Sequence, residues 1–246
     1  MHVVPDDILY LLFDALAFGS PWPWPEAKYD QERSRVPFVL SALCRHWRHA
    51  ARATPSLRTY LGFPTSPSEP VIRAQLDRLQ LIRSMSMDQP VDIVLQFGMA
   101  YTVRNDGGIR SQYFDVIIAV LNDVASRWRN VALKIPQNFA FGLESALRGE
   151  CPRLISLSIY FRDLKRLPRT PSLDRLAVMC SLELVHDGIH LPSLTTLAME
   201  KQRDPVVYEQ QIVATYASLL DLGIFDFCKP GSVKLLELPC LTSLTL

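Results

Sequence analysis

The sequence predicts an α/β protein in which a small helical module precedes an irregular solenoid with one parallel strand per repeat. Three observations lead to this fold class. Two amphipathic helical segments open the chain, a short pattern recurs in the last 96 residues, and leucine accumulates with that pattern. Of the 36 leucines, 20 lie in the last 96 of the 246 residues, so the chain changes character near residue 150.

Composition and charge are those of a globular protein without a strong overall charge. Hydrophobic residues make up 48% and charged residues 21%, as in an ordinary globular chain. A net charge of +1 gives no overall electrostatic reason to bind nucleic acid or an anionic membrane. The five cysteines are scattered and odd in number, which is typical of a reduced intracellular chain. No apolar stretch approaches the roughly 18 residues that span a bilayer. We therefore expect a soluble protein in the cytoplasm, the nucleus or both.

Residues 1–60 are predicted to form the helical module. The segment Val4–Leu16 starts with Pro5 and two acids, which favour a helix start, and its apolar residues form one wide stripe. A second helix is predicted over about Pro37–Ala53, with residues 17–36 as an insertion between the two. Two short helices cannot bury two broad stripes against each other. Part of this apolar surface must therefore meet another domain or another protein.

Residues 61–90 are predicted to form a stiff linker followed by a helix over 71–85, whose apolar residues keep helical spacing. A β-branched strand is predicted over 91–97, and a further helix over 111–127. Strand, helix, strand is one βα unit. The solenoid is therefore predicted to span residues 91–246.

The solenoid repeats the pattern x-Pro-x-Leu-x-x-Leu-x-apolar five times, with alanine replacing proline in the fourth copy. Leu-x-x-Leu-x-Leu at a period of about 20–29 residues is the leucine-rich-repeat signature. The alternating apolar positions place side chains on one face of a short strand. The proline of each copy is expected to end a helix that returns the chain. The first leucines, separated by 19, 21, 25 and 22 residues, are Leu154, Leu173, Leu194, Leu219 and Leu241.

Two segments of the helical module match a known family. Val4-Pro-Asp-Asp-Ile-Leu-x-x-Leu-Phe-x-x-Leu16 is similar to the opening of the F-box, with Val4 where leucine is usual. Leu40-x-x-Leu-Cys-Arg-x-Trp47 is similar to the second F-box signature. With the repeats included, most of the chain resembles fungal F-box proteins that continue into leucine-rich repeats. In the insertion, Trp22 and Trp24 either pack back on the module or form an exposed recognition spur, and packing is favoured.

The resemblance implies a non-catalytic adaptor role. F-box proteins dock on a Skp-type adaptor, which joins them to a cullin, and their repeats capture a substrate protein. The chain would then be the substrate-recognition subunit of an SCF-type ubiquitin ligase. The alternative is a leucine-rich-repeat interaction scaffold that recruits no ligase. The residues that match F-box positions, in its core or at the adaptor interface, are Pro5, Ile8, Leu9, Leu12, Phe13, Leu16, Leu40, Leu43, Cys44 and Trp47.

The substrate protein is expected to bind on the strand face that lies opposite the repeat leucines. Several candidates there are small or apolar, so they indicate no acidic or phosphate-specific ligand. The candidates are Ser158, Tyr160, Ala177, Met179, Ala198 and Glu200.

The sequence encodes no recognisable enzyme site. No P-loop, no Gly-x-Gly-x-x-Gly and no Gly-x-Ser-x-Gly occurs, so neither catalysis nor a cofactor is predicted. His186 and His190 have metal-like spacing, but Gly188 argues against the helix that such a pair needs, and a loop is favoured over a metal site. One local basic cluster, expected to face an acidic partner rather than nucleic acid, contains Arg45, His46, Arg48, His49, Arg52 and Arg58.

The last repeat stops at Leu246 within a predicted strand, without a polar capping unit. An uncovered apolar edge of this kind promotes aggregation. We therefore expect either a truncated chain or a partner that covers this edge.

Overall fold

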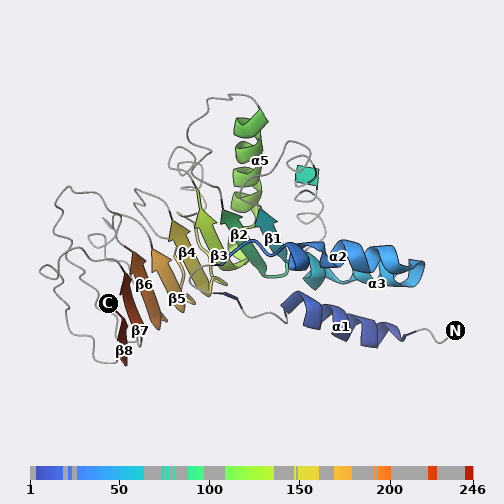
Figure 1. The fold of residues 1–246 in the computed structure, drawn as a ribbon, viewed down its shortest axis with the longest axis horizontal. Helices are drawn as coiled ribbons and strands as arrows, with labels where there is room; N and C mark the ends of the chain where they lie inside the picture. The colour runs from blue at the N-terminus through green and yellow to red at the C-terminus, as the bar shows by residue number, and fades with distance from the viewer. Residues whose placement is uncertain are drawn as a thin grey trace, which may run out of the picture.

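The computed structural model describes helices at the N-terminus and one parallel sheet (Figure 1). None of the described helices is long and apolar enough to cross a membrane. The described residues are 4–18, 22–23, 27–63, 88–96, 109–135, 149–160, 169–178, 193–200, 221–225 and 242–245, with Ala74, Leu76, Asp77, Gln80, Leu147 and Leu191.

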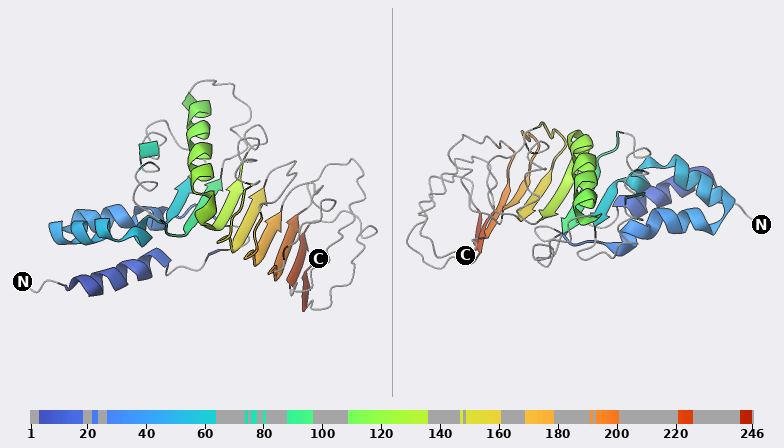
Figure 2. Two further views of the ribbon diagram at one scale, coloured as in Figure 1. Left: turned by 180° about the vertical axis from the view of Figure 1, so that it is seen from behind. Right: turned by 90° about the horizontal axis from the view of Figure 1, so that it is seen from above.

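The helices gather at one end of the sheet, beside its first strand (Figures 1 and 2). They are α1 (Asp6–Phe18), α2 (Gln31–Leu43) and α3 (Arg45–Ala53), followed by the 3-10 turn η1 (Pro55–Arg58). Helix α5 (Ile109–Asp123) lies apart from them and ends in a second 3-10 turn, η3 (Ala125–Arg127).

The described residues include eight strands, which form one parallel sheet in which spatial order follows sequence order. The predicted α/β class with parallel strands is confirmed, and each of the five leucine copies contributes one strand, β4 to β8. The strands are β1 (Tyr60–Phe63), β2 (Val91–Gln96), β3 (Trp128–Lys134), β4 (Ser156–Tyr160), β5 (Arg175–Val178), β6 (Thr196–Glu200), β7 (Asp221–Phe225) and β8 (Ser243–Thr245).

One face of the sheet carries the main hydrophobic core. Because side chains alternate along a strand, residues in register on neighbouring strands form rows across the sheet. The apolar row packs against buried residues of α5, including Phe114, Ile117 and Leu121. The buried part of the row runs through Leu61, Ile93, Val131, Leu157, Leu176 and Leu197. The backbone register continues the row to positions 222 and 244.

A tight turn precedes the strand in three of the leucine copies. The N–H of the first leucine donates to the carbonyl three residues earlier, at 3.1–3.2 Å, and the leucine itself is fully buried. Pro152 and Pro171 occupy the second position of such turns, where proline presets the required φ. The proline therefore shapes the turn that leads into the strand. The segments predicted to form returning helices lie mostly outside the described residues. The donor–acceptor pairs are Leu154–Cys151, Leu173–Thr170 and Leu194–Leu191.

The sheet begins earlier than predicted. Residues 61–90 were expected to form a linker and a helix, but β1 pairs in parallel with β2 from Tyr60 onward. A four-residue strand interrupted by Gly62 is too short to show an alternating pattern. The predicted strand at 91–97 and helix at 111–127 agree with β2 and α5. The helix predicted over 71–85 lies mostly outside the described residues.

The second predicted helix is two helices. Asp30 caps α2, since its side chain accepts from the Arg33 N–H at 2.9 Å, so α2 begins within the expected insertion. Cys44 then adopts an extended backbone, with φ −160° and ψ 175°, and separates α2 from α3. Pro37 lies inside α2 and does not start it.

Candidate functional site

Helix α1 carries two apolar stripes, and the structure buries only one of them. Leu9 and Phe13 are fully buried in a cluster formed by α1, α2, α3 and η1. Ile8, Leu12 and Leu16 follow the same i, i+4, i+8 spacing on a different face and stay exposed. Of the α1 residues that match the F-box, two therefore form the module's core, while these three and Pro5 are accessible.

The predicted residues of α2 and α3 divide in the same way. Leu40 is buried, whereas Leu43 is 59% exposed. The Cys44 thiol is exposed and accepts from the Trp47 N–H at 3.5 Å, which caps α3. The Trp47 ring lies edge-on to Phe13, with centroids 5.6 Å apart, and is partly buried. Trp47 thus helps to hold α1 against α3.

The exposed apolar side chains concentrate on this module. Among the described residues, every exposed large apolar side chain except Ile155 lies between Val4 and Leu43. They lie on α1 and, at Phe38, Val39 and Leu43, on α2. A concentration of this kind on one small module is the usual mark of a protein-interaction surface. We call the exposed residues Ile8, Leu11, Leu12, Leu16, Phe38, Val39 and Leu43 the apolar module surface.

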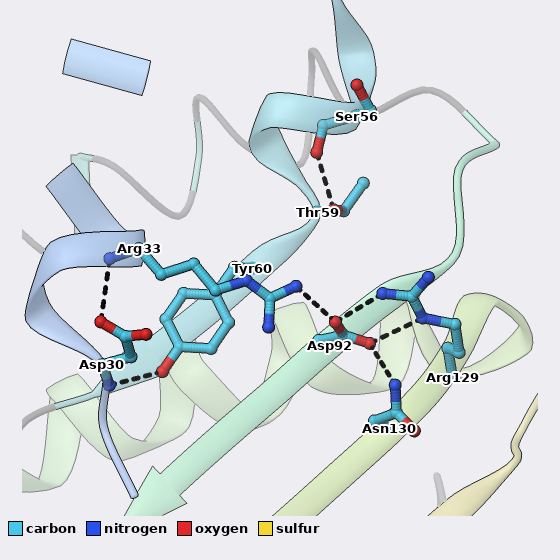
Figure 3. A network of polar contacts seen from close by, with 8 residues as sticks. All are labelled: Asp30, Arg33, Ser56, Thr59, Tyr60, Asp92, Arg129 and Asn130. Atoms are coloured by element: carbon cyan, nitrogen blue, oxygen red, sulfur yellow. Dashed lines mark hydrogen bonds and ion pairs between the residues drawn. The ribbon is translucent and has the colours of Figure 1, made fainter. Parts of the chain in front are cut away.

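A buried carboxylate ties the module to the sheet (Figure 3). Asp92 of β2, only 2% exposed at its side chain, accepts from the Arg33 Nη2 of α2 at 2.6 Å. Arg129 of β3 donates to the same carboxylate through Nε at 2.8 Å and Nη2 at 2.5 Å. The Asn130 Nδ2 adds a fourth hydrogen bond at 2.8 Å. Asp92 is therefore shared between a helix of the module and the neighbouring strand.

The surroundings of Asp92 favour its charged form. Burial alone would raise the pKa of Asp92, but the hydrogen bonds and positive charges of Arg129 and Arg33 outweigh it and hold the pKa below its usual value. The Arg33 guanidinium also lies over the Tyr60 ring, 4.6 Å from its centroid. The Tyr60 hydroxyl accepts from the Asp30 N–H at 2.8 Å, and burial raises the pKa of Tyr60 to about 12.

This network was not predicted from the sequence. Its signal is an acid, Asp92, inside an otherwise apolar strand, where an ionised group requires a partner. The partners lie 59 and 37 residues away along the chain, so no local pattern names them. The network performs no chemistry by itself. It fixes α2, and with it the module, on the first strands of the sheet.

The second face of the sheet does not present the predicted substrate residues. Ser158, Ala177 and Ala198 are buried, and Tyr160 is half-buried. Met179 and the side chain of Glu200 lie outside the described residues. The backbone register places these positions in one row across the sheet, which runs through Gly62, Val94, Ala132, Ser158, Ala177, Ala198, Gly223 and Thr245.

Several buried polar atoms on this face have no hydrogen-bond partner. They include the hydroxyls of Ser156 and Ser158 and the Oδ1 of Asn130. An unsatisfied buried hydroxyl costs about 1–3 kcal/mol. These atoms come from neighbouring strands, β3 and β4, beside the Asp92 network.

The insertion packs on the same face over the first strands. Trp22 and Tyr29 contact a small buried cluster that includes Val94 and Ala132. Gly62 is required there, because a Cβ would lie 2.6 Å from both the Tyr29 and Tyr60 rings. Trp22 is thus partly buried, in line with the favoured alternative, whereas Trp24 lies outside the described residues.

The described residues offer little for metal or covalent chemistry. No group of three or more His, Cys, Asp and Glu among them could hold a metal ion. Cys151 is buried, and burial raises the pKa of its thiol to about 11, which keeps it protonated near neutral pH. His186 and His190 lie outside the described residues. What the described site offers is an apolar surface for binding.

No protein-family model, curated protein or solved structure matches this chain.

Proposed function

We propose that the chain is the substrate-recognition subunit of an SCF-type ubiquitin ligase and that its apolar module surface docks on a Skp-type adaptor. The observation that carries this proposal is the exposure of one apolar stripe on a module that has already buried another. Leu9 and Phe13 complete the module's own core, so Ile8, Leu12 and Leu16 are not needed for folding. Apolar residues of this kind are the usual anchors of a helix-mediated interface.

The positions of these residues support the F-box interpretation in particular. In that family, the matched positions serve either the core or the adaptor interface, and here they divide into a buried and an exposed set. The leucine copies supply five consecutive parallel strands, β4 to β8, in the sheet whose first strands contact the module. In this proposal the module recruits the ligase, and the strands with their connections hold the substrate protein. The chain itself carries out no catalytic step.

The alternative is a scaffold whose helices only pack on the sheet. The Arg33–Asp92 contact favours the scaffold alternative in one respect, because this contact fixes α2 on β2. That contact uses the buried side of α2, however, and leaves Val39 and Leu43 exposed. A purely structural module has no use for this surface.

Co-elution with a purified Skp-type adaptor in size-exclusion chromatography tests the proposal. The full-length chain is expected to elute as a complex, and Leu12→Asp is expected to elute alone with an unchanged circular dichroism spectrum. Ile155→Asp is the matched control, because Ile155 is 38% exposed and Leu12 is 42% exposed. Ile155 lies outside the module, so this variant should still co-elute. Absence of a complex with the unmodified chain rules the ligase proposal out.

A further inference from the structure

Helix α3 presents a stripe of positive charge. Arg45, Arg48 and Arg52 are spaced i, i+3 and i+7, so they share one helix face, and all three are exposed. The opposite face packs inward through buried alanines such as Ala50. The sequence of α3, RHWRHAARA, contains no acid. We call these three residues the cationic stripe.

The stripe is unfavourable in the isolated chain. Like charges at i, i+3 and i+4 destabilise a helix, and Arg45 places a positive charge at the helix N-terminus, where the helix dipole is also positive. No ion pair among the described residues engages Arg45, Arg48 or Arg52. Burial, and then the charge of Arg52, lower the pKa of Arg58 nearby. Local arrangements that oppose stability without a compensating contact are expected at functional surfaces.

The stripe adjoins the apolar module surface. Leu43 ends α2 and is exposed, and Arg45 begins α3 two residues later. The Arg48 Nε donates to the Ser41 carbonyl at 2.8 Å, so its guanidinium reaches back over the last turn of α2. Exposed apolar and cationic side chains therefore meet at the corner between the two helices. Protein interfaces have this composition, with an apolar centre and a polar, charged rim.

We propose that the cationic stripe pairs with an acidic patch on the protein that docks on the apolar module surface, and that this pairing accelerates association. The inference rests on the proposed function, in which that protein is the Skp-type adaptor. A protein partner is favoured over a phosphate backbone or an anionic bilayer because the cations are few, lie beside exposed apolar residues and belong to a chain of net charge +1. Exposed rim charges act mainly on the association rate.

The test is the association rate constant with the purified adaptor, measured by stopped flow at 50 mM and 500 mM NaCl. The test variant is Arg45→Gln/Arg52→Gln, which keeps the Arg48–Ser41 hydrogen bond. The control is Arg153→Gln/Arg169→Gln, which removes two exposed arginines outside the module. Both variants lower the net charge from +1 by 2 to −1. Circular dichroism checks that each variant is folded.

At 50 mM NaCl the rate constant of the test variant should fall about three- to tenfold, with little change in the dissociation rate. The difference should disappear at 500 mM NaCl, where the Debye length is only a few ångströms. The control should follow the unmodified chain at both salt concentrations. Equal rates for the test variant and the unmodified chain overturn the inference while leaving the proposed function intact.

Two further results would also overturn it. If the unmodified chain does not bind the adaptor at either salt concentration, the proposed function fails and the inference fails with it. In a separate experiment, the unmodified chain is mixed with phosphatidylserine vesicles and with duplex DNA. The stripe would be assigned to phosphate recognition if the unmodified chain binds either of them, Arg45→Gln/Arg52→Gln does not, and the association rate constant with the adaptor is the same for both.

Discussion

Loss of the Asp92 carboxylate should weaken the structure strongly. This carboxylate accepts four hydrogen bonds between 2.5 and 2.8 Å from Arg33, Arg129 and Asn130, and the Asp92 side chain is 2% exposed. Asp92→Asn keeps the shape but leaves two guanidinium groups, 11% and 23% exposed at their side chains, without a counter-ion. Removing one partner of a buried ion pair costs about 3–5 kcal/mol.

A decrease of this size in the free energy of unfolding is large, because the whole free energy of unfolding of a protein is typically about 5–15 kcal/mol. For a chain of this length it corresponds to a decrease in Tm of about 6–20 °C. Urea unfolding followed by tryptophan fluorescence measures the free energy of unfolding. Asp115→Asn, which changes an exposed acid on α5, is the control and should stay within about 0.5 kcal/mol of the unmodified chain. A loss below about 1 kcal/mol in Asp92→Asn would refute the view that this network holds the module on the sheet.

Three other predictions follow from the same region. The folded-state pKa of Asp92 lies below its unfolded value, so its stabilising contribution is complete above a pH of about 4 and is lost as the pH falls through the folded-state pKa. In a plot of the free energy of unfolding against pH, the decrease on the acid side should therefore be shallower in Asp92→Asn. Gly62→Ala forces apart the Tyr29 and Tyr60 rings and should lower the free energy of unfolding, measured with urea, by about 1–3 kcal/mol. An unchanged free energy of unfolding would mean that the two rings can move aside without cost. Ser158→Ala removes an unsatisfied buried hydroxyl and should raise the free energy of unfolding by about 1 kcal/mol, whereas a decrease would show that the hydroxyl is hydrogen-bonded.

The regular part of the fold could be predicted because its signal is local and repeated. The leucine copies have one internal spacing, and each produces a parallel strand in the predicted order. The break at Cys44 could not be predicted, since apolar spacing continues across it and the extended backbone depends on the packing of α3 against α2. Strand β1 was missed because four residues carry too little periodicity.

The candidate F-box residues could be named from the sequence, but which of them are buried and which are exposed could not be predicted. Leu9 and Phe13 share helical spacing with each other, as Leu12 and Leu16 do, and both stripes are equally apolar. Which stripe is buried depends on α3, which packs on α1 from more than thirty residues away in sequence. The burial of Ser158, Ala177 and Ala198 could not be predicted either, because strand alternation indicates which face a side chain is on and not what covers that face.

The central claim is that the apolar module surface binds a Skp-type adaptor. Isothermal titration calorimetry of the full-length chain with the adaptor, at several temperatures, tests it most directly. The account predicts a saturable one-to-one complex with a negative heat-capacity change, as expected when apolar surface is buried, and loss of the binding heat in Leu12→Asp but not in Ile155→Asp. Absence of a saturable binding heat for the unmodified chain, or equal binding by Leu12→Asp, would contradict it.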